Sequence, residues 1–299
     1  MADKHILHLL SPLRHVSPFD VNMALDAGFD AVIPYSGVTR EDVTALVQDA
    51  IFSRPPKDGA KTGVFIGGKD AIGALDMLDA AKQAMVKPFV ISLFADPAGS
   101  FTTAAAMVAR AEQVLRQKHG RGLDGLKTLV FGATGVVGFA SAVIASLEGA
   151  QVTLAGYDGP DRVARAAAEI GKRFGVTPAS AEARTEAQKE GLLREAQIVF
   201  CAGRAGVQIL AAGQLAAAAG LLVVADVNAV PPAGVEGLKA GDDAAPIGGH
   251  AGLGIGALAV GQTKYRTEFG LFRRMIESDK PVAFDFRDAF ALARDLVSA

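Results

Sequence analysis

The sequence predicts an α/β protein with two doubly wound domains. Short apolar runs alternate with longer amphipathic runs along most of the chain, which is typical of parallel sheets with helices on both faces. The alternation stops at a stretch rich in glycine and charge, HGRGLDG at residues 119–125, and then restarts. With 299 residues, 50% of them hydrophobic, the chain is long enough to bury two cores.

The first half of the chain contains alternating strands and helices. Thr39 followed by Asp42 predicts a helix start of the capping-box kind, and Ser100 is expected to cap a long alanine-rich helix. The predicted strands are 5–10, 31–34, 62–66 and 89–93, and the predicted helices are 18–27, 39–52, 70–84 and 100–118.

The second half repeats the pattern. Its last segment, 271–298, is helical in spacing and is expected to pack back on the first domain. We therefore expect a substrate domain of residues 1–120 plus 271–299 and a second domain of residues 121–270, with a cleft between them. The predicted strands are 127–131, 152–155, 198–201 and 221–225, and the predicted helices are 136–148, 162–174 and 186–194.

Composition excludes several functional classes. Lys and Arg number 30 and Asp and Glu 32, which gives a formal net charge of −2. This near balance does not favour binding to nucleic acid or to an anionic membrane. The single cysteine, Cys201, excludes an internal disulfide framework and fits a buried strand end better than a nucleophile. The histidines do not cluster, so no metal site is expected. We expect a cytoplasmic protein, because the first residues lack the apolar core of a signal peptide.

One uncharged segment, residues 209–225, resembles a membrane span. Gly213, Gln214 and Gly220 interrupt it, and its alanine-rich first half differs from its branched second half. A buried helix followed by a buried parallel strand explains these features better than a span does.

The strongest local signal is LVFGATGVVG at residues 129–138. A strand leads into Gly132, Gly135 and Gly138, and an apolar helix follows. Glycines permit the sharp turn, the approach of backbone to a pyrophosphate and close packing of helix on strand, while the first helical amides bind phosphate. The spacing is GxxGxxG, because Ala133 stands where the common motif has a glycine. We predict a Rossmann dinucleotide-binding domain whose phosphate site includes Gly132, Thr134, Gly135, Val136, Val137 and Gly138.

The second strand of this domain ends in Tyr157 and Asp158. An acidic residue about 20 positions beyond the glycine loop is placed to bind the ribose hydroxyls, so Asp158 favours NAD, or else it caps the next helix. Arg162, one helical turn further on, would offset the repulsion of a 2′-phosphate, so NADP is also expected to bind.

Later strands of such a domain end beside the nicotinamide. Here those ends carry Ala202 and Gly203, then Asp226 and Asn228. Gly203 would let a flat ring approach the backbone. Asp226 and Asn228 are either ligands of cofactor and substrate or turn formers.

Beyond the glycine loop, the sequence resembles the NAD(P)-dependent methylene-tetrahydromethanopterin dehydrogenases of methylotrophic bacteria. The similarity runs nearly from end to end and includes loops outside the generic dinucleotide pattern. The stretches that carry it are PFDV at 18–21, FIGGKD at 65–70, GSFTTAAA at 99–106, VADVNAVPP at 224–232 and GLGIG at 252–256, with Lys264 beyond.

The resemblance implies hydride transfer from a methylene bridge on a reduced pterin to the nicotinamide, which gives a methenyl cation during one-carbon oxidation. It implies that Lys264 lies near the reacting carbon, paired with a carboxylate such as Asp20 or bound to a pterin carbonyl. It also implies that Phe19 packs on the pterin and that Ser100, Thr102 and Thr103 bind its polar edge. A small-molecule pterin and a second copy of the chain are the expected partners; segment 251–261 is either an interface or core.

Members restricted to NADP carry arginine where this chain has Tyr157, so the resemblance favours the type that uses both cofactors. Two alternatives remain. The first is a methylene-tetrahydrofolate dehydrogenase, which the absence of a YxxxK pair weakens, since Thr39 follows Tyr35 and Phe269 follows Tyr265 at the fourth place. The second is a non-catalytic NAD(P)-binding redox sensor.

Overall fold

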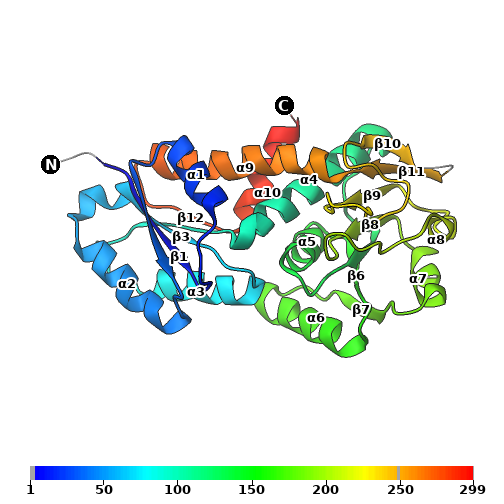
Figure 1. Ribbon diagram of the computed structural model, residues 1–299, viewed down its shortest axis with the longest axis horizontal. Helices are drawn as coiled ribbons and strands as arrows, with labels where there is room; N and C mark the ends of the chain where they lie inside the picture. The colour runs from blue at the N-terminus through cyan, green and yellow to red at the C-terminus, as the bar shows by residue number, and fades with distance from the viewer. Residues whose placement is uncertain (1–3, 248–249, 299) are drawn as a thin grey trace. The chain divides into compact units, whose positions relative to one another are not determined.

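A computed structural model describes residues 4–247 and 250–298 (Figure 1). The chain divides into two compact units. Unit 1 comprises Met1–Thr102 with Tyr265–Leu292, and unit 2 comprises Thr103–Lys264 with Ala293–Ala299. The predicted domain limits at 120 and 270 differ from the bounds of these two units. The division into a substrate domain and a cofactor domain stays a prediction.

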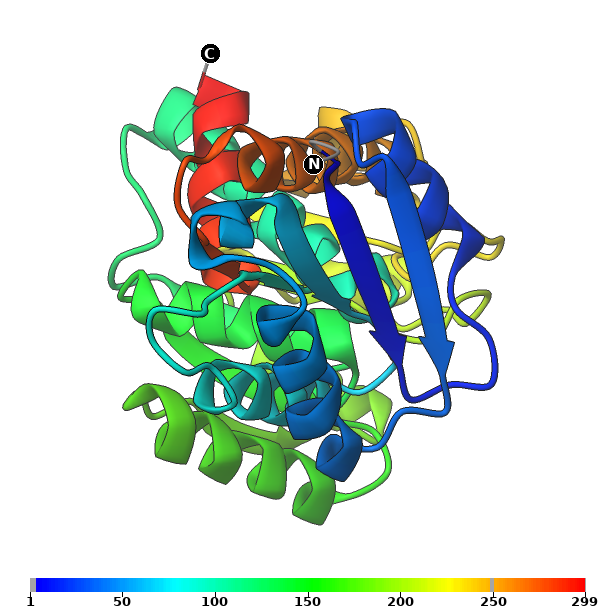
Figure 2. The ribbon, with the colours of Figure 1, turned by 90° about the vertical axis from the view of Figure 1, so that its left-hand side faces the viewer.

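Unit 1 is built on a five-stranded parallel sheet in the order β12-β4-β3-β1-β2. Figure 2 shows β1 and β2 side by side. Read from the β2 edge, the strands β1 to β4 follow the order 2-1-3-4. The order therefore reverses between β1 and β3, the place where doubly wound sheets bind their ligands. The strands are β1 (Ile6–Ser11), β2 (Ala31–Ser36), β3 (Thr62–Ile66), β4 (Ser92–Ala95) and β12 (Ala283–Phe284).

The helices of unit 1 begin where the sequence predicts. Asp42 accepts a hydrogen bond from the backbone N–H of Thr39 at 2.8 Å, so the predicted capping pair is confirmed, and this bond lowers the pKa of Asp42. Asp70 caps the next helix through the N–H of Gly73. The helices are α1 (Pro18–Ala27), α2 (Arg40–Phe52) and α3 (Ala71–Gln83), with short 3₁₀ turns η1 (Pro56–Lys61) and η2 (Pro97–Gly99).

Unit 2 contains a seven-stranded sheet in the order β10-β11-β9-β8-β5-β6-β7. All pairs are parallel except β10 with β11. Numbered along the chain, its six parallel strands read 3-2-1-4-5-6, which is the Rossmann order, with the reversal between β5 and β8. The strands are β5 (Lys127–Phe131), β6 (Gln151–Gly156), β7 (Ala179–Glu182), β8 (Ile198–Cys201), β9 (Val223–Asp226), β10 (Asp243–Ile247) and β11 (His250–Ile255).

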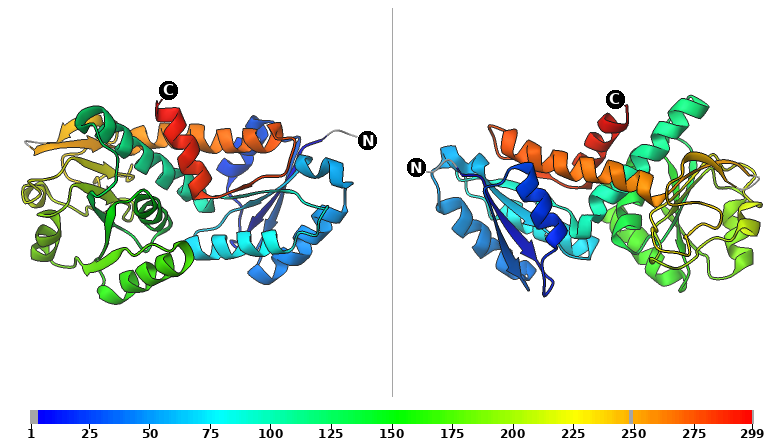
Figure 3. Two further views of the ribbon diagram at one scale, coloured as in Figure 1. Left: turned by 180° about the vertical axis from the view of Figure 1, so that it is seen from behind. Right: turned by 45° about the horizontal axis from the view of Figure 1, so that its top comes forward.

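The core of unit 2 lies between this sheet and its helices. Strands β8 and β9 are buried along their whole length, including Asp226 at the end of β9, as is typical of the central strands of a parallel sheet. Helix α6 packs against β6 and β7 (Figure 3). The helices are α5 (Val136–Leu147), α6 (Pro160–Phe174), α7 (Glu186–Leu193) and α8 (Ala212–Leu215). Three further helices contain residues of both units: α4 (Ser100–His119), α9 (Ala257–Glu277) and α10 (Phe286–Ser298).

Three sequence predictions require correction. The strand predicted at 89–93 lies at Ser92–Ala95, because Phe89 instead stacks edge-on against Phe52, with ring centroids 5.3 Å apart. Ser100 does not cap α4, because the carboxylate of Asp96 does so. The segment predicted to be helical at 271–298 is interrupted by strand β12.

The uncharged segment at 209–225 forms the short helix α8, a turn and strand β9. Across the described residues, every helix is too short or too polar to traverse a bilayer. The same residues contain no group of three metal-ligating side chains.

Candidate functional site

The glycine turn follows β5 at the switch point of the unit 2 sheet. Gly132 has φ +75°, and a Cβ on it would lie 2.1 Å from the carbonyl oxygen of Ala202. A Cβ on Gly138 would lie 2.4 Å from the carbonyl oxygen of Gly132. Only glycine fits at either position, so strand, turn and helix pack as closely as a dinucleotide site requires.

The tip of the turn is open. Thr134 and Gly135 are exposed, and Gly135 precedes the first residue of α5 in extended conformation. The N–H groups of Val136, Val137 and Gly138 occupy the first turn of the helix, where no helical carbonyl can accept them. Ala133, which replaces the usual glycine, is buried and leaves the turn intact. This arrangement fits a pyrophosphate.

Beyond β6, Asp158 and Arg162 form an ion pair at 2.5 Å across one helical turn. Gly159 between them has φ +107°, and Pro160 begins α6. Tyr157 is 72% exposed beside them. The acidic and basic groups predicted to contact the ribose therefore contact each other.

The ends of β8 and β9 carry the remaining predicted cofactor residues. A Cβ on Gly203 would lie 2.5 Å from the Cδ1 atom of Ile209, so a larger residue there would have to displace the Ile209 side chain. Asp226 and Asn228 are both buried. Their side chains bond loop backbone, which favours the turn-forming role over direct ligation; direct contact with cofactor or substrate stays a prediction.

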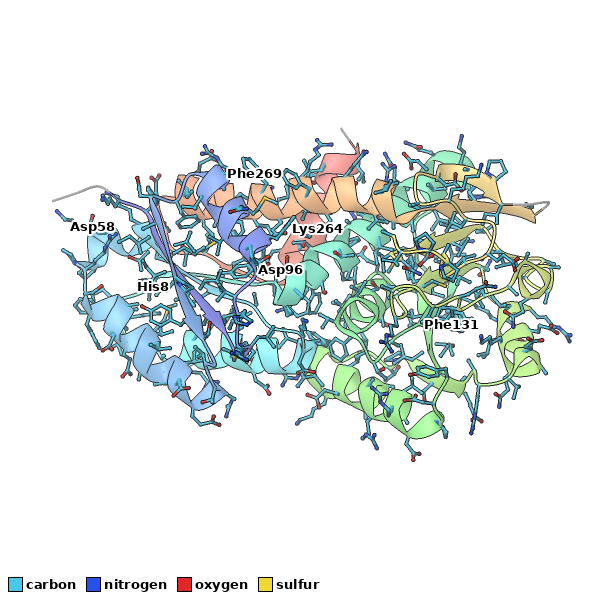
Figure 4. All side chains as sticks on the ribbon, in the orientation of Figure 1. His8, Asp58, Asp96, Phe131, Lys264 and Phe269 are labelled. Atoms are coloured by element: carbon cyan, nitrogen blue, oxygen red, sulfur yellow. The ribbon has the colours of Figure 1, made fainter. Side chains whose placement is uncertain are left out.

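In unit 1 a buried carboxylate follows β4. The Oδ1 atom of Asp96 accepts the N–H groups of Phe101 and Thr102 at 2.8 and 3.2 Å. Its Oδ2 accepts the hydroxyl of Thr102 at 2.6 Å (Asp96 is labelled in Figure 4). The sequence analysis missed Asp96, although an aspartate between a buried strand and a long helix is a recognisable capping signal.

Thr102 is fully buried, so its hydroxyl is used within the protein. Ser100 is partly buried in the first turn of the same helix, and the neighbouring Thr103 is partly buried as well. Of these predicted pterin contacts, Ser100 and Thr103 therefore fit better than Thr102.

The predicted residues Phe19 and Asp20 lie in the first turn of α1. Phe19 is 46% exposed, and its ring meets the ring of Tyr265 edge-on at 6.5 Å between centroids. Asp20 is buried, and Ser17 caps the helix by accepting its N–H at 3.3 Å. An exposed aromatic ring at a helix start can pack on a flat ligand.

Lys264 lies in α9 and belongs to unit 2. It is partly buried and is labelled in Figure 4. Its predicted pairing with Asp20 stays a prediction.

A cavity of about 680 Å³ lies elsewhere in unit 2, at the amino ends of β5, β6 and β7. Lys127, Gln151 and Ala179, the first residues of those strands, line it. Ligands of doubly wound sheets bind at the opposite, carboxyl edge, so this cavity does not coincide with the candidate site.

Comparison with known proteins identifies the family of the chain. Residues 18–98 match the family model described as methylene-tetrahydromethanopterin dehydrogenase, N-terminal. The chain is 50% identical over 98% of its length to the NAD(P)-dependent methylenetetrahydromethanopterin dehydrogenase of Methylorubrum extorquens, 99% of which is covered. It is 34% identical over 94% of its length to the bifunctional protein MdtA of the same organism, 94% of which is covered.

Solved structures of low sequence identity share the fold. Shikimate 5-dehydrogenase from Listeria monocytogenes is 14% identical, with TM-score 0.53, 91% of this chain covered and 92% of that one. Quinate dehydrogenase from Corynebacterium glutamicum is 15% identical, with TM-score 0.52 and 99% of both chains covered. The chain has their two-sheet α/β architecture, and by its sequence it belongs to the methylene-tetrahydromethanopterin dehydrogenase family.

Proposed function

We propose that the protein transfers a hydride from methylene-tetrahydromethanopterin to NAD(P)⁺, giving methenyl-tetrahydromethanopterin, as a step in the oxidation of one-carbon units. The observation that carries this proposal is 50% identity over 98% of the chain to an enzyme named for that reaction. The glycine turn at the switch point supports it, because its geometry suits a dinucleotide.

The residues of unit 2 would hold the cofactor along the carboxyl edge of the sheet. Backbone amides of residues 134–138 would bind the pyrophosphate, and Ala202 and Gly203 would form a flat floor near the nicotinamide. The bound cofactor supplies the hydride acceptor.

Both NAD and NADP would be accepted through the pair formed by Asp158 and Arg162. The ion pair uses one oxygen of Asp158, Oδ2, so the other oxygen can accept a ribose hydroxyl while the pair stays intact. Arg162 is about half exposed, so it can turn from Asp158 to a 2′-phosphate. Exposed Tyr157 would lie against the adenosine end.

The pterin would meet residues at the starts of α1 and α4. The exposed ring of Phe19 would pack on the pterin, and the hydroxyls of Ser100 and Thr103 would bond its polar edge. The buried hydroxyl of Thr102 already donates to Asp96 and would act through the helix start.

The chemistry requires positioning and electrostatic tuning rather than an acid–base pair. The product cation is shared by the two nitrogens that flank the reacting carbon, and no proton has to move. Holding donor carbon and acceptor ring face to face supplies most of what the protein must contribute.

Lys264 is the proposed catalytic residue, with Asp20 as its candidate partner. Lys264→Ala should abolish turnover and leave the dissociation constant of NADH within about twofold, since Lys264 would act at the reacting carbon and not on the cofactor. Initial rates and nicotinamide fluorescence measure the two quantities. Arg266→Ala, an exposed site on the same helix, is the control. Unchanged turnover in Lys264→Ala would remove Lys264 from the mechanism.

The reaction itself is tested by absorbance of reduced nicotinamide. The protein is mixed with the methylene form of tetrahydromethanopterin or of tetrahydrofolate, each with NAD⁺ or NADP⁺. Turnover with the methanopterin carrier and both cofactors is expected. Turnover with folate alone would make the protein a folate enzyme, and binding of NADH without turnover in all four mixtures would make it a redox sensor.

A cytoplasmic homo-oligomer is part of the same proposal. The lone cysteine suits a reducing compartment. Leu258, 57% exposed, lies in segment 251–261, which the sequence offers as an interface or as core. Light scattering on the purified protein would give the mass of the assembly.

A further inference from the structure

Two loops follow β8 and β9 at the carboxyl edge of the unit 2 sheet. The β8 loop is residues 202–211, and the β9 loop is residues 227–238. Both Ile209 and Leu210 donate their N–H groups to the carbonyl oxygen of Gly234, at 2.7 and 3.0 Å, and Glu236 donates to the carbonyl of Leu210 at 2.9 Å. The loops are therefore joined by backbone hydrogen bonds.

Asp226, the last residue of β9, binds the β9 loop from inside. It is 2% exposed, and its carboxylate accepts the N–H groups of Asn228 at 3.0 Å, Gly234 at 2.7 Å and Val235 at 3.3 Å. A Cβ on Gly234 would lie 2.8 Å from the Oδ1 atom of Asp226, so this close approach requires glycine. The carboxylate thus joins the start of the loop, at Asn228, to its later part, at Gly234 and Val235.

Asn228 binds both loops. Its Oδ1 accepts the N–H of Gly206, in the β8 loop, at 3.1 Å and the N–H of Val230 at 2.9 Å. Its Nδ2 donates to the carbonyl oxygen of Pro232 at 2.8 Å. An amide with these partners has little bonding capacity left for a ligand.

The joined loops also contact the glycine turn. The carbonyl of Ala202 occupies the space where Gly132 would carry a Cβ, and Ile209 occupies the corresponding space at Gly203. The Lys189 ammonium donates to the carbonyl of Ile209 at 2.6 Å. A continuous set of contacts thus connects the glycine turn with the hydrogen bonds that Asp226 accepts.

We propose that Asp226 and Asn228 are positioning residues: they hold the two loops as one body at the nicotinamide end of the site, without touching the cofactor or the pterin. The proposal rests on the proposed function, because it assumes that a dinucleotide binds along this edge. It assigns Asn228 a role through the backbone of Gly206 rather than one in substrate binding.

Paired ligands test this role. NADH contacts the whole site, whereas ADP-ribose lacks the nicotinamide. Asn228→Ala should weaken NADH binding by about tenfold and leave ADP-ribose within about twofold, and kcat should fall more than the substrate KM rises, because a loosened loop misplaces the ring. Asn228→Asp keeps an oxygen that can accept from Gly206 and Val230 but loses the donor to Pro232, so it should recover only part of the NADH affinity.

Asp242→Ala is the matched control. The carboxylate of Asp242 also caps a turn of unit 2, by accepting the N–H of Lys239 at 2.8 Å, but that turn is outside both loops. Its affinities for NADH and ADP-ribose should both stay within about twofold of the unsubstituted protein.

Three outcomes would overturn the proposal. Equal loss of both ligands in Asn228→Ala and Asn228→Asp would indicate a purely structural role. Unchanged NADH affinity with a raised pterin KM would indicate direct contact with substrate. No change in NADH affinity and no change in the pterin KM would show that Asn228 has no role at the site. Failure of the proposed function is distinct, because the unsubstituted protein would then fail to bind NADH or would turn over neither carrier.

Discussion

At the scale of single residues, the proposed cofactor choice rests on the pair formed by Asp158 and Arg162. The two side chains neutralise each other in the free protein. In the proposed site, NADP would draw Arg162 away from Asp158, whereas NAD would bind beside the intact pair. The proposal therefore links acceptance of one cofactor to acceptance of the other through a single ion pair.

Substitutions at this pair should separate the two cofactors. Asp158→Asn should tighten NADPH about tenfold and weaken NADH about tenfold, because it removes repulsion of the 2′-phosphate and an acceptor for the ribose. Arg162→Gln should weaken NADPH about tenfold or more and leave NADH nearly unchanged. Nicotinamide fluorescence titrations give both constants.

Arg165→Gln is the control for that comparison, since Arg165 is exposed on the next turn of α6. Equal losses for NADPH in Arg162→Gln and Arg165→Gln would show a general effect of positive charge. Unchanged NADPH affinity in both variants would contradict the role of the Asp158–Arg162 pair in selecting the cofactor.

At the scale of elements, the start of α4 depends on Asp96. Its carboxylate is fully buried and satisfies two backbone N–H groups and one hydroxyl. The left-handed conformation of Ala98, φ 55°, lies within the segment that this carboxylate spans. The position of Ser100 and Thr103 therefore depends on one side chain.

Asp96→Ala should lower the free energy of unfolding by about 2–4 kcal/mol, because it leaves buried donors without an acceptor. Asp70→Ala removes an exposed cap from α3 and should cost about 1 kcal/mol. Urea unfolding followed by circular dichroism measures both. Equal costs would mean that burial of Asp96 adds nothing to its capping role.

The elements also show what the sequence could predict. Apolar period and capping residues predicted β3, β5, β8 and α1 to the residue, because each has strong local signals. Strand β7, with the polar sequence ASAE, has no such signal and forms by pairing with β6. Strands β11 and β12 likewise pair with strands distant in sequence, β9 and β4.

The candidate site divides in the same way. The glycine turn is local, so spacing alone predicted Gly132, Gly135 and Gly138. Phe19 and Lys264 have no local pattern, and resemblance to the family was needed to single them out. The network around Asp226 was not predictable, since Gly206 and Gly234 meet Asn228 and Asp226 only in the folded sheet.

At the scale of the whole molecule, stability should depend on pH through His8. Its Nδ1 atom lies 3.1 Å from the Tyr35 hydroxyl, beside a cavity of about 230 Å³ that Asp49 also lines. Burial, and secondarily the charge of Arg54, lowers the pKa of His8. The unfolded chain therefore binds a proton that the folded protein resists.

The contribution of His8 is present above the unfolded pKa and is lost as pH falls through that value toward the lower folded pKa. The free energy of unfolding should thus decrease between about pH 7 and pH 5, and His8→Gln should reduce that slope. Urea unfolding at a series of pH values tests this. The exposed His119→Gln is the control, and parallel curves for His8→Gln and the unsubstituted protein would contradict the assignment.

The buried thiol of Cys201 can report how often the sheet of unit 2 opens. It is the only cysteine in the sequence, it is fully buried in β8, and burial, together with the charge of Asp226, raises the pKa of its thiol. An alkylating reagent can reach the sulfur only when the central strands of the unit 2 sheet separate, so the alkylation rate measures how often they do. A bound dinucleotide would slow that rate in proportion to its occupancy. Ligand binding to this protein should thus be measurable through a thiol that is buried from solvent in the folded sheet.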